Sequence, residues 1–145
     1  MYLLDKKEEA FEVKECLRKF YVFMKRIAVV DDEPDITNVL KKGLERHGFA
    51  VDIFNDPHAA LASFQPKYYD LMIIDIRMPR INGFDLYRQL KKRDTSVKIC
   101  FLTAFQIYYE EFRKMFPTID VKAFIRKPIS ISNLVNQIDA AIASN

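Results

Sequence analysis

Short apolar runs alternate with longer amphipathic stretches from residue 26 to the end of the chain. A run that is apolar at every position suits a strand covered on both faces, and apolar residues at every third or fourth position suit a helix packed on a sheet. The predicted strands are 26–31, 50–54, 70–75, 97–103 and 121–125. Five strands alternating with five helices predict a doubly wound (βα)5 α/β fold, in which a parallel sheet carries helices on both faces.

Signals for helix ends support this division. The first of the five helices begins after Pro34 and ends at His47 and Gly48, where glycine suits a left-handed cap. The last helix begins after Ser130, a favourable N-cap residue. The other three helices are expected at about 57–64, 83–93 and 106–116.

Residues 1–24 predict a helical extension that precedes the domain. Apolar residues recur every seven positions at Leu3, Ala10, Leu17 and Met24, with Val13 and Phe20 between them. Lys6 interrupts the second stripe and the pattern covers only about three heptads, so we expect a short packing helix and not a coiled coil. The pattern leaves open whether this helix docks on its own domain or pairs two chains into a homodimer. It also leaves open a natural start at Met24, with the preceding segment poorly ordered.

The composition is that of one globular domain, since half of the 145 residues are hydrophobic and only three are glycine. Cys16 and Cys100 have no metal-ligand spacing around them, which suits a reducing, cytoplasmic setting. No apolar stretch approaches the roughly 20 residues of a membrane span, and the charged start does not resemble a signal peptide. The net charge of +3 predicts no nucleic-acid partner.

Candidate chemistry lies at the carboxyl ends of the predicted strands. The apolar run 71–74 leads directly into Asp75, and Pro79 closes the segment. An isolated aspartate at this place is usually a simple strand or turn cap. However, parallel strands share one carboxyl edge, which is where open α/β sheets bind ligands. The residues predicted to meet at this edge are Asp31, Asp32, Glu33, Asp75, Thr103, Arg126 and Lys127.

This set of residues indicates phosphoryl chemistry assisted by a cation. Neighbouring carboxylates repel one another, and their hard oxygen atoms suit Mg²⁺. Lys127 could neutralise a phosphoryl group, and Thr103 could donate a hydrogen bond to it. The arrangement permits a carboxylate to attack phosphorus and to form an acyl phosphate.

The motifs that hold these residues resemble those of response regulator receiver domains in two-component signalling. They are Val29-Val30-Asp31-Asp32-Glu33-Pro34, Ile74-Asp75-Ile76-Arg77-Met78-Pro79 with Asn82-Gly83, Leu102-Thr103-Ala104 and Lys127-Pro128. The resemblance covers residues 25–143 and implies a flavodoxin-like fold with strand order 2-1-3-4-5. It divides the chain into the extension 1–24 and a receiver domain, 25–145. It also implies a signalling switch that catalyses its own phosphoryl acceptance, not an enzyme with a separate substrate.

The resemblance also implies a role for each matching residue. Asp75 is expected to be the phosphoacceptor, with Thr103 and Lys127 binding the phosphoryl oxygens. Mg²⁺ is expected to bind at Asp75, at Asp32 directly, at Asp31 through water and at the backbone carbonyl of Arg77. The bond between Lys127 and Pro128 is often cis in this family.

The family's switch pairs the threonine with an aromatic residue three positions before the lysine, which is Phe124 in this chain. Phosphorylation would draw Thr103 toward the phosphoryl group, and Phe124 could fill the vacated space. Phenylalanine has no hydroxyl group, so an output that needs a tyrosine hydrogen bond is excluded here. A buried strand aromatic with no switching role is an equally good interpretation of Phe124 alone. Residues 117–121 replace the family's usual Gly-Ala pair, which affects the geometry of switching more than the chemistry.

The expected partners follow from the resemblance. A histidine kinase or a phosphotransfer protein would supply the phosphoryl group, and a target protein would bind the face made by helix 106–116, strand 121–125 and the last helix. In that helix Tyr108 and Tyr109 are adjacent, so we expect one of them to be exposed. The last helix ends close to Asn145, which predicts a stand-alone receiver.

Three alternative functions were compared with the receiver. A haloacid-dehalogenase-type phosphatase needs a second acid two residues after Asp75, where this chain has Arg77. A flavodoxin needs a phosphate-binding loop, whereas the acidic loop 31–33 repels phosphate. The third alternative is a phosphorylation-independent interaction module, which predicts that Asp75→Ala leaves partner affinity unchanged.

Overall fold

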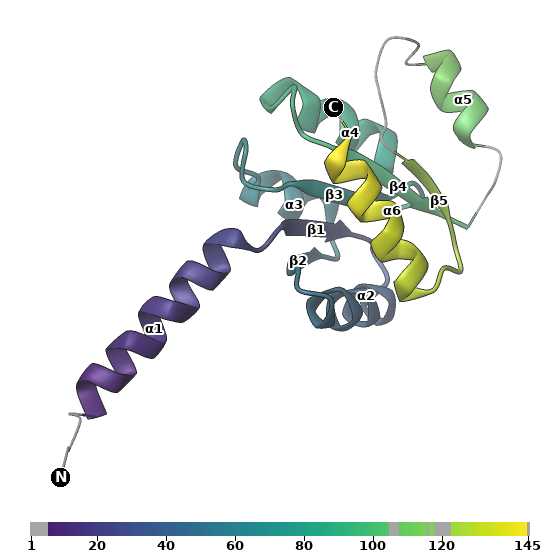
Figure 1. The fold of residues 1–145 in the computed structure, drawn as a ribbon. Coiled ribbons are helices and arrows are strands. Elements are labelled where there is room, and N and C mark those ends of the chain that lie inside the picture. Colours follow the sequence, from purple (N-terminus) through teal and green to yellow (C-terminus); the bar gives the residue numbers. More distant parts are fainter. Residues whose placement is uncertain (1–5, 105–107, 116, 118–122, 145) are drawn as a thin grey trace.

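The computed structural model describes residues 6–104, 108–115, 117 and 123–144 (Figure 1). Five strands form one parallel sheet with the order β2-β1-β3-β4-β5, which confirms the predicted flavodoxin-like topology. The strands are β1 (Arg26–Val30), β2 (Ala50–Phe54), β3 (Leu71–Asp75), β4 (Ile99–Thr103) and β5 (Ala123–Arg126). The helices are α1 (Lys6–Phe23), α2 (Pro34–Arg46), α3 (Pro57–Ser63), α4 (Gly83–Arg93), α5 (Tyr108–Met115) and α6 (Ile131–Ala143).

Alternate residues of the strands supply two separate cores, one on each face of the sheet. In β1, Ala28 and Val30 face the cluster that includes Leu86 and Leu90 of α4. Ile27 and Val29 face the opposite cluster, which includes residues of α2 and α6. Burial on both faces explains why the central strands are apolar at every position.

Most predicted element boundaries agree with the structure within two residues. The main difference is β4, which begins at Ile99 and not at residue 97. Asp94 ends α4 and its carboxylate accepts hydrogen bonds from the N–H and hydroxyl groups of Ser96, so the chain turns before it becomes extended. In β5, Arg126 belongs to the strand, and residues 121–122 lie outside the described residues.

The structure confirms an N-terminal helix. In Figure 1, α1 leads away from the sheet, and only residues 24 and 25 separate it from β1. Its apolar side chains are not buried by the domain, since Val13 is 58% exposed and Phe20 is 61% exposed. Within the described residues, no helix is long and apolar enough to cross a bilayer.

Candidate functional site

The carboxyl edge of the sheet brings the predicted site residues to one place. Asp31 directly follows β1, Asp75 is the last residue of β3, and Thr103 is the last residue of β4. Asp75 pairs with Leu102 in the register of β3 and β4, so Thr103 lies one residue further along this edge. Lys127 directly follows β5, and its backbone N–H donates to the carbonyl oxygen of Thr103 at 2.8 Å.

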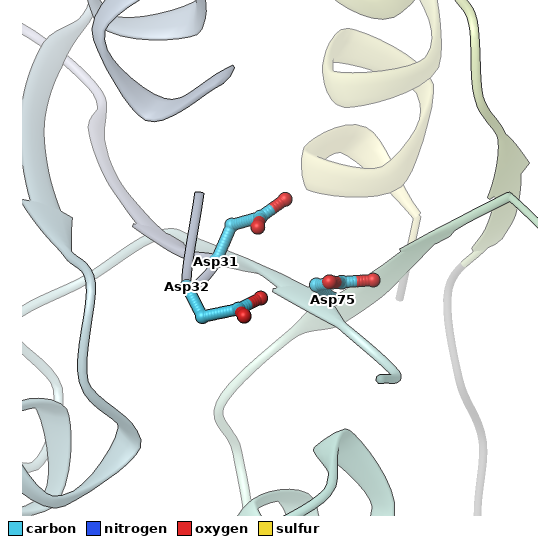
Figure 2. A group of neighbouring side chains, drawn as sticks. All are labelled: Asp31, Asp32 and Asp75. Atoms are coloured by element: carbon cyan, nitrogen blue, oxygen red, sulfur yellow. The ribbon is translucent and has the colours of Figure 1, made fainter. Parts of the chain in front are cut away.

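Three carboxylates gather at this edge (Figure 2). One oxygen atom each from Asp31, Asp32 and Asp75 lies within 4.8 Å of the others. Asp31 and Asp75 are buried, at 1% and 6% exposure, while Asp32 is partly exposed. Ionised oxygens this close repel one another in a place with little water, and a hard divalent cation is the ligand that best relieves that repulsion.

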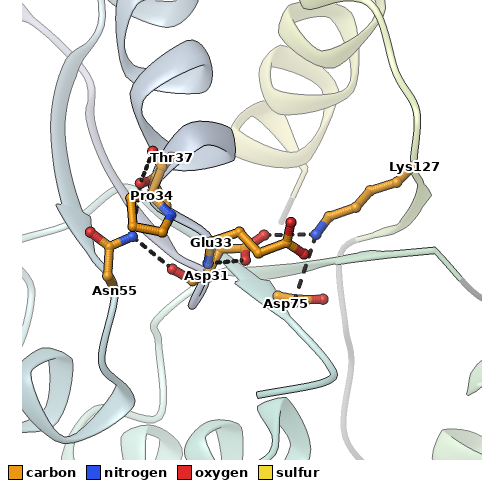
Figure 3. A network of polar contacts seen from close by, with 7 residues as sticks. All are labelled: Asp31, Glu33, Pro34, Thr37, Asn55, Asp75 and Lys127. Atoms are coloured by element: carbon orange, nitrogen blue, oxygen red, sulfur yellow. Dashed lines mark hydrogen bonds and ion pairs between the residues drawn. The ribbon is translucent and has the colours of Figure 1, made fainter. Parts of the chain in front are cut away.

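Lys127 is the cation that the described part of the site contains (Figure 3). Its Nζ lies 2.7 Å from Oδ2 of Asp31 and 3.7 Å from Oδ2 of Asp75. Burial alone would lower the pKa of Lys127, but the hydrogen bond to Asp31 and the charges of Asp75 and Asp31 raise it above its ordinary value. Lys127 is therefore charged at neutral pH and bridges two of the three acids.

The surroundings of Asp75 disfavour its negative charge. Burial is the largest effect on it, and together with repulsion from Asp31 it raises the pKa of Asp75 from 3.8 to about 6. Lys127 and the backbone N–H of Arg77 act in the opposite direction but do not cancel this effect. A further cation at this edge would therefore favour the ionised form of Asp75.

A second layer of contacts fixes Asp31 (Figure 3). Oδ1 of Asp31 accepts from the N–H of Glu33 at 3.0 Å. Its carbonyl oxygen accepts from Nδ2 of Asn55 at 2.9 Å, and the same amide group also donates to Oγ1 of Thr37. Thr37 donates in turn to the carbonyl oxygen of Pro34 at the start of α2. The end of β1 and the start of α2 are therefore tied together beside the acids.

The loop after Asp75 closes tightly on the start of α4. The N–H of Gly83 donates to the carbonyl oxygen of Ile76 at 2.8 Å, and Oδ1 of Asn82 caps the helix by accepting from the N–H of Asp85. A Cβ atom at Gly83 would collide with the carbonyl oxygen of Asp75 and would lie 2.9 Å from Cα of Ile76. Glycine is needed here because the helix approaches the backbone of the acidic residue so closely.

Phe124 lies in the core and not at the acidic edge. It is partly buried, and its ring centroid is 5.2 Å from that of Phe101 on the neighbouring strand. Phe101 also contacts Phe84 of α4, edge to face. The structure thus places the predicted switch residue in an aromatic group that connects β5, β4 and α4.

Sequence reasoning located the acids, Thr103 and Lys127 but missed Asn55 and Thr37. Asn55 directly follows β2, so its place at the carboxyl edge could have been read from the strand pattern. Thr37 lies within α2 and carries no comparable signal. The Lys127–Pro128 bond is cis, as the resemblance implied. Tyr108 and Tyr109 have side chains outside the described residues, so the expectation that one of them is exposed stays a prediction.

Comparison with known proteins agrees with this geometry. The family model for the response regulator receiver domain matches residues 27–139. The transcriptional regulatory protein TrcR of Mycobacterium tuberculosis is 30% identical over 110 residues, which are 76% of this chain and 42% of TrcR. The response regulator receiver protein CpdR of Brucella abortus is 33% identical over 116 residues, which are 80% of this chain and 95% of CpdR.

Solved structures give the same result. The response regulator protein TrrA from Thermotoga maritima, solved in complex with Mg(2+)-BeF, is 32% identical and superposes with a TM-score of 0.69. That match covers 80% of this chain and 97% of TrrA. Together, the fold, the acidic edge and the family match over most of its length show that this chain belongs to the response regulator receiver domain family.

Proposed function

We propose that this receiver accepts a phosphoryl group on Asp75 from a histidine kinase or a phosphotransfer protein and passes the signal on through protein contacts. The observation that carries this proposal is the meeting of three carboxylates within 4.8 Å at one sheet edge, with Lys127 bridging Asp31 and Asp75. Such a site offers a nucleophilic oxygen and a positive charge for the phosphoryl oxygens at the same place.

The reaction is a displacement at phosphorus. A carboxylate oxygen of Asp75 attacks, a new P–O bond forms, and the P–N bond to the donor imidazole breaks, with the electron pair leaving on nitrogen. The product is an acyl phosphate. Attack needs the ionised form of Asp75, and a pKa of about 6 leaves most of this group ionised at neutral pH.

The donor set fits Mg²⁺, because it consists of three carboxylate oxygens within 4.8 Å of one another, of which that of Asp32 belongs to a partly exposed residue. Asp31, Asp32, Asp75 and the backbone carbonyl of Arg77 would hold the ion. When bound, Mg²⁺ supplies positive charge that offsets the repulsion between the acids and an incoming phosphoryl group. The likeness to TrrA, which was solved with Mg(2+)-BeF, supports this assignment.

Lys127 and Thr103 then have separate tasks. Lys127 leaves or shares its contact with Asp31 and neutralises a phosphoryl oxygen, since its Nζ is already within 3.7 Å of Asp75. The hydroxyl group of Thr103 donates a hydrogen bond to a second phosphoryl oxygen. As Thr103 moves, Phe124 can take the space beside it, and the aromatic group of Phe84, Phe101 and Phe124 repacks. The negative charge added at Asp75 would thereby alter the surface near β5 and α4.

The surface that carries the output is the face of α5, β5 and α6, where a target protein would bind. The stand-alone character expected from the sequence stays a prediction, and a homodimer is not required for the phosphoryl chemistry. Phosphoryl acceptance itself depends only on residues at the carboxyl edge of the sheet.

Intact mass spectrometry tests the proposal. Wild-type protein incubated with Mg²⁺ and acetyl phosphate should gain the mass of one phosphoryl group. Asp75→Asn and a sample with excess EDTA should gain none. If Asp75→Asn gains the same mass, Asp75 is not the acceptor.

One observation favours a second function. The exposed apolar stripe of α1 is a binding surface with no link to the acidic edge, as expected for an interaction module that ignores phosphorylation. Partner affinity that is equal for phosphorylated wild type and Asp75→Ala would favour this second function, whereas the switch predicts a clear difference.

A further inference from the structure

Helix α1 presents an apolar stripe that the rest of the described chain leaves uncovered. Val13, Leu17 and Phe20 are 58%, 50% and 61% exposed. These residues lie on one side of the helix, since they follow one another at spacings of four and three. In Figure 1 the helix extends away from the sheet. Only at its C-terminal end does the stripe come near the receiver, where Phe20 borders a hollow together with His47 and Phe49. Large apolar side chains in one continuous row indicate a contact with another molecule.

The stripe has the pattern of a coiled-coil seam. Within α1, Ala10 and Leu17 occupy the first core position of two successive heptads, and Val13 and Phe20 occupy the second. The described helix has 18 residues, which is about 27 Å at 1.5 Å per residue. It therefore holds about two complete heptads of seam, enough for a weak association that depends on concentration.

Charged residues beside the seam favour pairing with a second α1 helix in the parallel orientation. Glu9 flanks the seam on one side and Lys14 flanks it on the other. In a parallel pair of identical helices, each Glu9 comes opposite Lys14 of the second copy, so two attractive pairs form. In an antiparallel pair with the seams in contact, Lys14 comes opposite Lys14 of the second copy, which is repulsive. The chain is thus complementary to itself in the parallel direction.

We propose that α1 pairs with α1 of a second copy of this chain in a parallel, two-stranded coiled coil. The inference does not rest on phosphorylation of Asp75. Because only residues 24 and 25 connect α1 to β1, the parallel direction holds both receivers at the same end of the coiled coil. Each receiver then meets the other at a high effective concentration, and even a weak contact between their output faces would be populated.

The solution mass of the full chain tests the pairing. Sedimentation equilibrium at high micromolar concentration should give twice the 17.1 kDa of one chain, with dissociation on dilution. The same result is expected for Asp75→Asn, so a failure of the phosphorylation proposal would not affect this test. A mass of one chain at all concentrations, or of three or more chains, would overturn the proposal.

Two aromatic residues of α1 provide a matched pair of variants. Phe20 lies in the seam and Phe11 lies on the opposite side of the helix, and both are highly exposed, at 61% and 69%. Phe20→Glu should abolish the dimer, while Phe11→Glu should retain it. Equal effects of the two variants would show that the seam is not the interface. Because both side chains are exposed and neither lies at the acidic edge, acetyl phosphate should label both variants as it labels the wild type.

The direction of pairing needs its own variants. Lys14→Glu should weaken the dimer, because the new carboxylate would lie opposite Glu9 of the second copy. The double variant Glu9→Lys with Lys14→Glu should restore the dimer. In a Cys16→Ser background, Ala10→Cys should form an intermolecular disulfide on mild oxidation, because parallel pairing puts the two residues opposite each other. A dimer that resists this cross-link and ignores the charge exchange would be antiparallel, which contradicts the proposal.

Discussion

Asp75 has an unfavourable charge in the metal-free protein. Burial and the neighbouring Asp31 raise its pKa to about 6, and the ion pair with Lys127 at 3.7 Å does not compensate. The folded chain therefore keeps a buried carboxylate at neutral pH at the expense of stability. A divalent cation bound at this edge would offset the charge of Asp75 and reduce that cost.

The first prediction concerns Asp75→Asn without metal. The folded pKa of Asp75 lies above 3.8, so its stabilising contribution is fully present below pH 3.8 and is lost as the pH rises through about 6. One pKa unit corresponds to about 1.4 kcal/mol, so the amide variant should be more stable than wild type by about 1 to 3 kcal/mol at pH 7.5. Urea unfolding in EDTA should show this gap shrinking toward pH 4. A gap that is constant with pH would contradict the assigned burial effect.

The second prediction concerns Gly83. In Gly83→Ala the new Cβ atom would collide with the backbone of Asp75 and Ile76, which cannot move aside as a side chain can. We expect a loss of about 1 to 3 kcal/mol in the free energy of unfolding and slower phosphoryl uptake. Gly43→Ala is the comparison, because the three atoms nearest to its Cβ atom all belong to the side chain of Ile131, which can shift where a backbone cannot. If the two variants behave alike in both assays, the close approach at Gly83 is not important for the site.

The side chain of Asp94 holds the end of α4 and the turn before β3 in place. Its buried carboxylate accepts from the backbone N–H of Lys67 at 2.8 Å and from two groups of Ser96. Lys67 has a φ of 62° in a turn closed by a hydrogen bond from Tyr68 to Gln65. A side-chain acceptor on the N–H of Lys67 helps to hold this left-handed conformation.

The third prediction follows from this arrangement. Although burial alone would raise the pKa of Asp94, hydrogen bonds from Ser96 and Lys67 lower it below 3.8. Asp94 therefore contributes stability above pH 3.8, and this contribution is lost as the pH falls through the lowered value. Asp94→Asn should cost about 1 to 2 kcal/mol at pH 7. Thermal unfolding between pH 7 and 3 should show the cost decreasing; an equal cost at both ends would contradict a charged Asp94.

The sequence predicts the strands and the residues at the acidic edge, but not the contacts between those residues. Apolar runs such as 71–74 identified the strands, because parallel strands are buried on both faces. Strand ends then located Asp31, Asp75, Thr103 and Lys127 at one edge. Predicting the start of β4 at residue 97 was wrong by two residues, because Ser96 bonds to Asp94 and local polar contacts leave no mark in hydrophobic periodicity.

Contacts that depend on three-dimensional distance could not be predicted. The bridge from Lys127 to both Asp31 and Asp75 depends on side-chain reach across the sheet edge, and the raised pKa of Asp75 depends on how deeply it is buried. Asn55 joins Asp31 to Thr37 through contacts 24 and 18 residues apart in sequence. The pattern of apolar and polar residues cannot determine such contacts. The resemblance to receiver domains implied what each site residue does, but not the distances between them.

An apolar hollow on the surface of the receiver lies beside the acidic edge. Its volume is about 370 Å³, and its lining includes Val39 of α2, Leu102, Lys127 and Pro128. Val39 is 63% exposed there. Because Lys127 lines this hollow and also contacts Asp75, we expect a donor protein that brings a phosphohistidine to Asp75 to dock here.

The fourth prediction separates docking from chemistry. Val39→Asp places a charge in the hollow and should slow phosphoryl transfer from a protein donor about tenfold or more, the size of effect that loss of a strong interface residue produces. Labelling by acetyl phosphate should stay unchanged, since small donors need no docking surface. Asn38→Asp adds the same charge to α2 at a residue that does not line the hollow. Equal slowing by both variants would indicate a general charge effect and exclude docking at this hollow.

Chemical mapping can show whether the phosphoryl group is bonded to the carboxylate of Asp75. Borohydride reduces an acyl phosphate to an alcohol, so an aspartyl phosphate becomes homoserine. After labelling with acetyl phosphate and Mg²⁺, reduction and proteolysis, peptide sequencing by mass spectrometry should find homoserine at position 75 and leave Asp31 and Asp32 intact. Homoserine at position 31 or 32, or a modified residue that is not an aspartate, would contradict the account.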